Sequence, residues 1–120
     1  MFNEIILEHF RNPRNAGELA GATTQIEVSN PVCGDILRLS AAVEGGRIVE
    51  VRFKTQGCVA AIAASSVLTE MLAGKTLEHA RTITALSISD FLGGLPPASF
   101  HAAQLCVDGI AALVRKAPAD

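Results

Sequence analysis

Apolar residues near the start of the chain recur at the spacing of a helix. Within residues 2–10, the apolar positions fall on one side of a helical turn: Phe2, Ile5, Ile6 and Phe10. Pro13 and Gly17 follow, and both residues disfavour continuation of a helix. The sequence therefore predicts an amphipathic helix over residues 2–10. His9 lies in this helix, and we expect it at the surface, as we do His79.

The pattern then changes to alternation between apolar and polar positions, over residues 24–29, 35–43 and 47–55. In the third segment the expected inward positions are Val49, Val51 and Phe53. The segment "EGG" separates the second run from the third, and its glycines permit the positive φ of a hairpin turn. We therefore expect a three-stranded antiparallel sheet with one solvated face.

From Cys58 onward the pattern is helical. Residues 58–74 are rich in alanine and end on a glycine, which predicts a helix packed on most sides. Shorter helical segments follow, the first with Thr76 as its N-cap. The last helix starts after "LPP", and its core stripe is predicted as Ala103, Val107, Ile110 and Val114. A helix, three strands and then helices predict an α+β fold, with the helices packed on one sheet face.

Composition narrows the classes of function. A chain of 120 residues, 49% hydrophobic, is sized for a single domain over residues 1–120. The net charge is −2, no basic cluster is present, and Trp and Tyr are absent, so a nucleic-acid partner is not indicated. The sequence shows neither a signal peptide nor a run of about 18 apolar residues, so we expect a cytoplasmic protein without a membrane partner.

Three widely spaced cysteines, Cys33, Cys58 and Cys106, raise the question of chemistry. In a reducing compartment a disulfide framework is improbable. Buried inert cysteines, reactive thiols and metal ligands all remain open at this point.

Four polar residues stand where regular elements begin, and together they form a candidate metal site. Cys33 and Asp35 flank Gly34 at the start of a predicted strand, and residues two apart on a strand edge point the same way. Cys58 opens a helix, whose N-terminus stabilises a thiolate. His101 follows the rigid "LPP" segment. Each residue alone also has a purely structural interpretation: a small buried thiol, a loop cap or a surface histidine. As a set, two thiolates, a carboxylate and an imidazole suit Zn²⁺ or an iron–sulfur cluster of mixed ligation.

Several motifs in order resemble the IscU/NifU-type scaffold proteins of iron–sulfur cluster assembly, from end to end of the chain. "HFRNPRNAG" is similar to the N-terminal segment of that family, and "CGD" to its first ligand motif. "RFKTQGCVAAIAASSVLTEMLAGKTLEHA" is similar to its second cysteine and the helix that follows. "LPP" at Leu95–Pro97 and His101 fall where the family has its last motif.

The resemblance implies a three-stranded sheet packed with helices, and a scaffold rather than an enzyme. It implies that a [2Fe–2S] cluster or iron is held and then passed to apo iron–sulfur client proteins, with Zn²⁺ as an alternative occupant. Cys33, Asp35, Cys58 and His101 carry over as ligands or near-ligands. A cysteine desulfurase is the implied sulfur donor and partner.

The chain departs from the family in two places. Ala102 stands where the family has its third cysteine, which is associated with receiving sulfur. Cys106 lies one helical turn further on the same face, so it is the thiol that could in principle replace the missing one. Its Cα is about 6 Å deeper along the helix axis, a long way for a metal–sulfur bond of about 2.3 Å, so we expect Cys106 in the core. Ala98 and Ser99 replace the Val-Lys of the family's chaperone-recognition segment, so a chaperone partner is not indicated. The chain also lacks the insertion of the zinc-binding SufU branch.

These departures leave two other functions open. One is a zinc-binding, cluster-free adaptor that partners or regulates a cysteine desulfurase. The other is a degenerate paralogue that binds no metal.

Overall fold

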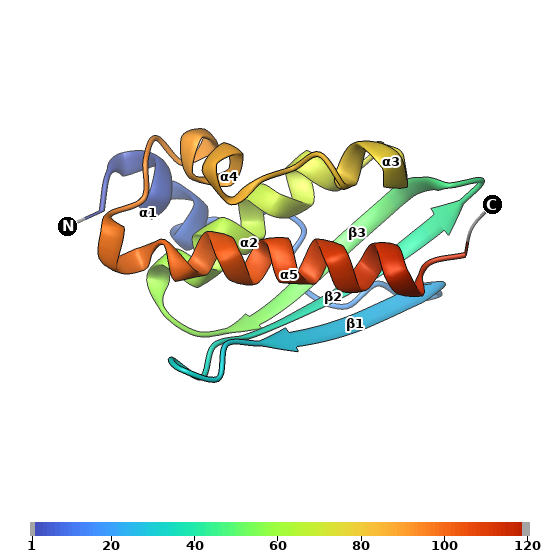
Figure 1. Cartoon of the computed structure of the whole chain (residues 1–120), viewed down its shortest axis with the longest axis horizontal. Coiled ribbons are helices and arrows are strands. Elements are labelled where there is room, and N and C mark those ends of the chain that lie inside the picture. Colours follow the sequence, from blue (N-terminus) through green and yellow to red (C-terminus); the bar gives the residue numbers. More distant parts are fainter. Residues whose placement is uncertain (1, 119–120) are drawn as a thin grey trace.

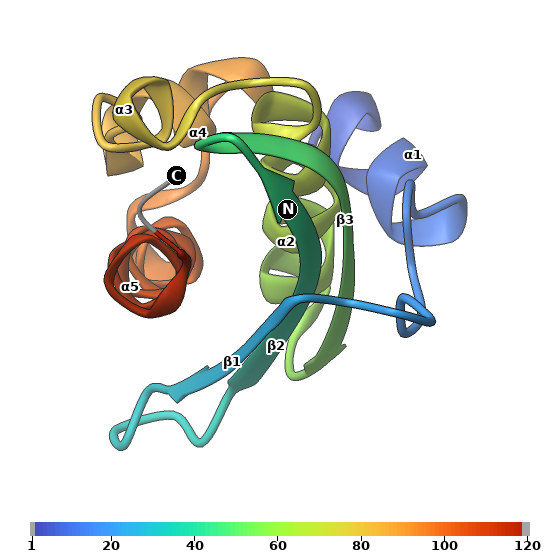
Figure 2. The same cartoon turned by 90° about the vertical axis from the view of Figure 1, so that its right-hand side faces the viewer.

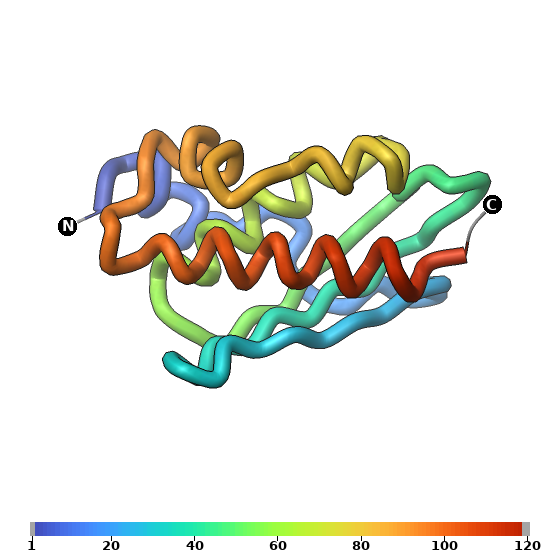
Figure 3. Tube along the Cα trace, viewed as in Figure 1, coloured from blue at the N-terminus to red at the C-terminus, as the bar shows by residue number. Residues whose placement is uncertain are grey.

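The computed structural model describes residues 2–118 and contains a three-stranded sheet with helices (Figure 1). The elements in chain order are α1 Glu4–Arg11, β1 Thr24–Ser29, β2 Ile36–Glu44, β3 Arg47–Gln56, α2 Val59–Leu72, α3 Leu77–Ala80, α4 Ala85–Phe91, the 3₁₀ turn η1 Pro97–Ser99 and α5 His101–Lys116. The described part of the chain is elongated, with extents of 42 × 24 × 23 Å. The first and last parts of the described chain lie at opposite ends of the long axis (Figure 3).

The sheet has the predicted topology, with order β1-β2-β3 and both pairings antiparallel. Leu39 of β2 stands opposite Ile26 of β1 and Phe53 of β3. Gly45 and Gly46 join β2 to β3, and their φ values of 57° and 74° suit the tight turn that matches the twist of the strands.

Helices α2 and α5 lie side by side against one face of the curved sheet, with α3 and α4 alongside (Figure 2). Helix α5 packs on β1 and β2, and α2 packs on β3. Helix α1 packs on α2, and α4 on both α2 and α5. The expected α+β architecture, with helices on one sheet face, is therefore confirmed.

The segment after α1 passes around the free edge of β3 to reach β1 (Figure 2). Ala16 forms a parallel bridge with Phe53, whose N–H donates to the Asn15 carbonyl at 2.9 Å. The Leu19 N–H then donates to Ser40 Oγ at 2.9 Å. This contact buries Ser40 on the face that the alternation assigned to solvent. The segment thus shields an edge strand that would otherwise present unpaired backbone groups.

One inward position in β3 was predicted wrongly. The register of β2 and β3 shifts between Ala42 and Val43, so Ile48 pairs with Val43 and Glu50 with Ala42. Val49 is the extra residue of this β-bulge and is 51% exposed, while Ile48 takes the buried place. A bulge breaks the period of two, which the alternation alone does not reveal.

The buried stripe of α5 is also rotated from the prediction. Ala103 and Ile110 are buried as expected, but Val107 and Val114 lie at the margin of the core. The other fully or largely buried positions are Ala102, Leu105, Cys106, Gly109 and Leu113. The reason is that α5 contacts both the sheet and α2, which requires a wider buried face than one stripe. Residues Pro97–Lys116 are long and apolar enough to cross a membrane by length and composition, and here their apolar side forms part of the core.

In α1 the expected apolar side is only partly buried. Ile6 is fully buried, whereas Ile5 is 47% and Phe10 is 37% exposed. His9 takes the inward position instead, contrary to its expected place at the surface. His9 Nδ1 lies 2.8 Å from Ser66 Oγ, which also accepts the Arg14 N–H at 2.9 Å. His9 therefore links α1 and the segment after it to α2. His79 is exposed, as expected.

The buried His9 predicts a pH dependence of stability. Desolvation and the nearby Arg14 charge lower the pKa of His9, and they outweigh the opposing effect of Glu70 and Glu8. The unfolded chain therefore binds this proton more readily, so its contribution to stability is fully present above about pH 6.5 and is lost as the pH falls through the folded pKa. We expect urea unfolding to show a larger loss of stability from pH 7.5 to 5.5 in the natural protein than in His9→Gln. Equal losses in the two proteins would contradict this prediction.

Candidate metal centre

Three junctions between elements meet at one end of the molecule, the left-hand end in Figure 1. They are the loop between β1 and β2, the connection from β3 to α2, and the turn that leads from η1 into α5. Each junction carries residues that the sequence analysis selected: Cys33 and Asp35, Cys58, and His101. Residues far apart along the chain are thus brought to a common place by the packing of α2 and α5 on the sheet.

Three of the four side chains form one close group, and Cys58 lies next to two of them. One ligand atom each from Cys33, Asp35 and His101 lie within 4.8 Å of one another. Cys58 Sγ lies 3.6 Å from Asp35 Oδ2 and 3.9 Å from His101 Nε2. His101 Nε2 lies 3.6 Å from Asp35 Oδ2. Separations of this order are those of atoms that could surround a single ion or a small cluster.

Cys33 and Asp35 share a direction for a reason other than the one predicted. The strand β2 starts only at Ile36, so both residues belong to the loop rather than to a strand edge. The Gly34 N–H donates to the Asn30 carbonyl at 2.7 Å, and the Asn30 N–H donates to the Asp35 carbonyl at 2.9 Å. Gly34 has a φ of 78°, which is accessible to glycine at little cost. This turn brings the two side chains together.

Cys58 is the N-cap of α2, with extended backbone at φ −74° and ψ 172°. Its side chain makes no capping hydrogen bond to the helix. The sulfur is therefore free to face Asp35 and His101. The unpaired N–H groups of the first helical turn carry partial positive charge, which favours an anion at this position.

Asp35 is the most buried of the four residues, with a side chain 8% exposed, against 33% for His101. The hydrogen bond found for its carboxylate among the described residues is the long one from the Cys58 thiol. A buried carboxylate normally has stronger partners than a thiol at 3.6 Å. The donor set of two sulfurs, one carboxylate and one imidazole is therefore chemically suited to a cation, and it has the mixture of donors that zinc and iron–sulfur clusters accept.

The cysteines differ sharply in their surroundings. Cys33 and Cys58 are exposed, whereas Cys106 is fully buried. Burial raises the pKa of the Cys106 thiol to about 12, and this outweighs the opposing effect of the nearby Ser65 hydroxyl. Cys106 is therefore a protonated thiol in the core at neutral pH, and its place in the core is as expected. Since only a thiolate acts as a nucleophile or metal ligand, Cys106 is unsuited to either role. Ala102, next to His101, is also fully buried.

Gly57 touches this site, although the sequence analysis gave it no role. An ideal Cβ placed on Gly57 would lie 2.7 Å from Asp35 Cγ. The sequence shows a glycine directly before Cys58. Its closeness to Asp35, which lies in a different loop, is visible only in the structure.

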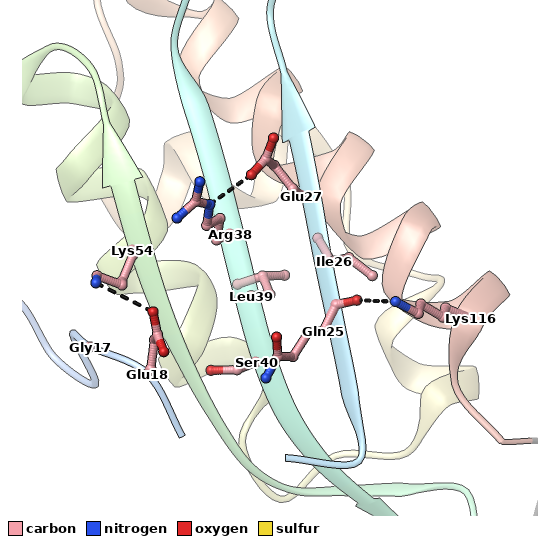
Figure 4. Close-up of a pocket in the computed structure, with 10 residues that line it drawn as sticks. All are labelled: Gly17, Glu18, Gln25, Ile26, Glu27, Arg38, Leu39, Ser40, Lys54 and Lys116. Atoms are coloured by element: carbon pink, nitrogen blue, oxygen red, sulfur yellow. Dashed lines mark hydrogen bonds and ion pairs between the residues drawn. The ribbon is translucent and has the colours of Figure 1, made fainter. Parts of the chain in front are cut away.

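A separate hollow of about 340 Å³ lies on the outer face of the sheet (Figure 4). Its charged side chains are all engaged: Arg38 with Glu27 at 2.6 Å, Lys54 with Glu18 at 3.4 Å, and Lys116 with the Gln25 carbonyl at 2.7 Å. Arg38 and Lys54 are neutralised by carboxylates, and Lys116 is held by a neutral carbonyl, so the hollow lacks the cluster of donors found at the other site.

Comparison with known proteins gives a consistent assignment. The family model of the NifU-like N terminal domain matches residues 1–119. The iron–sulfur cluster assembly scaffold protein IscU of Azotobacter vinelandii is 42% identical over 118 residues, covering 95% of this chain and 91% of that protein. IscU 1 of Archaeoglobus fulgidus, also described as a cluster assembly scaffold, is 43% identical over 110 residues, covering 92% of this chain and 72% of that one.

Solved structures share the fold. A NifU-like N-terminal protein from Brucella abortus aligns with a TM-score of 0.62 at 22% identity, covering 94% of this chain and 80% of that one. A protein from Fervidobacterium islandicum, proposed as a SUF-system scaffold, aligns with a TM-score of 0.76 at 22% identity, covering 94% and 96% of the two chains.

The surroundings of the cysteines predict their reactivity. In the native protein we expect Ellman's reagent to titrate two thiols, Cys33 and Cys58, because they are exposed. Cys106 should react only after unfolding, since it is buried and its pKa is raised to about 12. The variant Cys106→Ala should give two thiols under both conditions. Three thiols that react at similar rates in the native protein would refute the assignment of Cys106 as buried and of Cys33 and Cys58 as exposed.

Proposed function

The chain belongs to the family of NifU-like N-terminal domains, and on this premise we propose that it is a scaffold on which iron–sulfur clusters are assembled before transfer to apo-proteins. One observation carries the proposal: a mixed set of sulfur, oxygen and nitrogen donors converges at an exposed end of the domain. The cluster is the cargo of this site, and we propose Cys33, Asp35, Cys58 and His101 as the residues that hold it.

The donor types suit temporary binding. Soft thiolates prefer iron–sulfur clusters, whereas carboxylates prefer harder cations. Cys33 and Cys58 would therefore supply the firm contacts with a [2Fe–2S] cluster, and Asp35 the contact that is released most easily. His101 would be the fourth ligand or would carry a proton at Nε2 during exchange. The exposure of both thiols leaves the cargo accessible to a recipient protein.

The partners follow from the chemistry of the cargo. The sulfide of a cluster requires a sulfur donor, for which we propose a cysteine desulfurase. The recipients would be apo iron–sulfur proteins. Free thiols at Cys33 and Cys58 need a reducing compartment, which agrees with a cytoplasmic location. A binding protein of this kind carries out no turnover of its own. Zinc is the alternative occupant, and a zinc-holding adaptor of the desulfurase is the alternative function.

Anaerobic reconstitution tests the proposal. With iron, sulfide and a desulfurase, we expect the protein to gain the visible absorption of a [2Fe–2S] cluster and to activate an apo-ferredoxin. Cys58→Ala should lose both properties. Cys106→Ala should retain them, because the Cys106 thiol is buried and protonated and is not one of the four donors. A colourless protein that holds one zinc ion, unchanged by iron and sulfide, would overturn the scaffold in favour of the adaptor.

The role of Asp35 leads to a kinetic prediction. Asp35→Cys replaces the carboxylate with a softer ligand in nearly the same position. We expect the variant to hold its cluster longer and to transfer it to apo-ferredoxin about tenfold more slowly, equivalent to about 1.4 kcal/mol in the release barrier. Transfer at the natural rate, followed by circular dichroism of the ferredoxin cluster, would show that the carboxylate does not govern release.

A further inference from the structure

Gly57 lies between the last residue of β3 and the N-cap of α2, and its backbone does not explain why it is a glycine. Eight other glycines of the described chain have positive φ, where a side chain would be strained. Gly57 is not among them, so any residue could adopt its conformation. The reason for a glycine must therefore come from its neighbours.

The space that a side chain would need at Gly57 is filled by Asp35. A Cβ at this position would lie 2.7 Å from Asp35 Cγ and 2.8 Å from Asp35 Oδ1. It would also lie 3.2 Å from the Cβ of Ala61, one turn into α2. Carbon atoms at optimal non-bonded separation stand about 3.5–4.0 Å apart, so one of the groups would have to move.

The group that can move is the Asp35 carboxylate. Gly57 is exposed, but its backbone is held on either side by the paired strand β3 and by helix α2, and Ala61 is buried in the core. The Asp35 side chain is only 8% exposed, but it stands at the end of a loop next to the exposed Cys33 and Cys58, so a rotation about χ1 can take its carboxylate to another staggered position. That rotation would carry Oδ2 away from Cys58 Sγ, at 3.6 Å, and from His101 Nε2, also at 3.6 Å.

We infer that Gly57 is a positioning residue, whose missing side chain keeps the Asp35 carboxylate in the donor set with Cys58 and His101. The inference rests on the proposed function, since it concerns the same site. It assigns to Gly57 an effect on metal binding that acts through Asp35 and leaves the fold intact.

The first experiment is Gly57→Ala, with zinc affinity measured by competition against a chromogenic chelator. We expect binding to weaken by about 10–100-fold, the usual effect of removing a group that orients a metal ligand. The thermal unfolding midpoint of the metal-free protein should stay close to that of the natural chain. Rotation of Asp35 removes the two shortest contacts, and the contact with Ala61 Cβ at 3.2 Å needs a shift of only a few tenths of an ångström. Unchanged zinc affinity would overturn the inference.

Combining Gly57→Ala with Asp35→Ala tests whether the loss of zinc affinity is caused by displacement of the carboxylate. In Asp35→Ala, the remaining donors should bind zinc more weakly, and adding Gly57→Ala should cause no further loss, because the carboxylate that it displaces is absent. An equal loss in both backgrounds would mean that the alanine acts on Cys58 or on the backbone, which would refute a role through Asp35.

Gly109→Ala is the matched control. Gly109 also lacks a positive φ, and its added Cβ would lie 2.8 Å from Leu37 Cδ2 in the core. This variant should lower the thermal midpoint and leave zinc affinity unchanged. The opposite pattern is expected for Gly57→Ala, and the same pattern in both variants would overturn the inference.

A metal-free measurement distinguishes this inference from the proposed function. If the natural protein binds neither zinc nor a cluster, the proposed function fails. The crystal structure of metal-free Gly57→Ala still decides the inference: a carboxylate turned away from Cys58 and His101 supports it, and an unmoved carboxylate overturns it.

Discussion

The packing of α2 is the constraint on which the rest of the structure depends. This helix contacts β3, α5, α1 and α4, and most of its residues are buried. Its small side chains, including Ala60, Ala63 and Ala64, are fully buried and allow neighbouring elements to approach closely. Because α2 cannot shift without disturbing four neighbours, the position of its N-cap is fixed, and with it the sulfur of Cys58.

The site also includes residues from the ends of two other elements, which are placed next to the N-cap of α2. The sheet aligns the loop of Cys33 and Asp35 with the start of α2, and the packing of α5 on β1 and β2 brings His101 to the same end. No single element carries the site. The precision of the four donors comes from the rigidity of the core, while the donors stay near the surface, where a partner could reach the two cysteines.

Much of this arrangement could be read from the sequence because it depends on local signals. Alternation gave the three strands, and the glycines at 45 and 46 gave the hairpin. The candidate residues were recognisable because each stands where an element begins. The family resemblance was confirmed by the match over residues 1–119.

The features that escaped prediction depend on contacts between distant segments. The bulge at Val49 is a property of the pairing between β2 and β3, and the burial of His9 depends on Ser66 in α2. The rotation of the α5 stripe follows from its contact with two layers at once. Gly57 is the clearest example, because the reason for a glycine there is the carboxylate of Asp35, a residue of a different loop.

The location of the donors at three separate junctions has a consequence for the energetics of the whole domain. A ligand held by residues from positions 33 to 101 ties together the loop between β1 and β2, the start of α2 and the start of α5, so its binding free energy adds to the stability of the entire fold. Loading and folding are thermodynamically coupled in such a design. A protein that binds any partly opened form of this domain would thereby weaken its hold on the cargo, even without touching the four side chains.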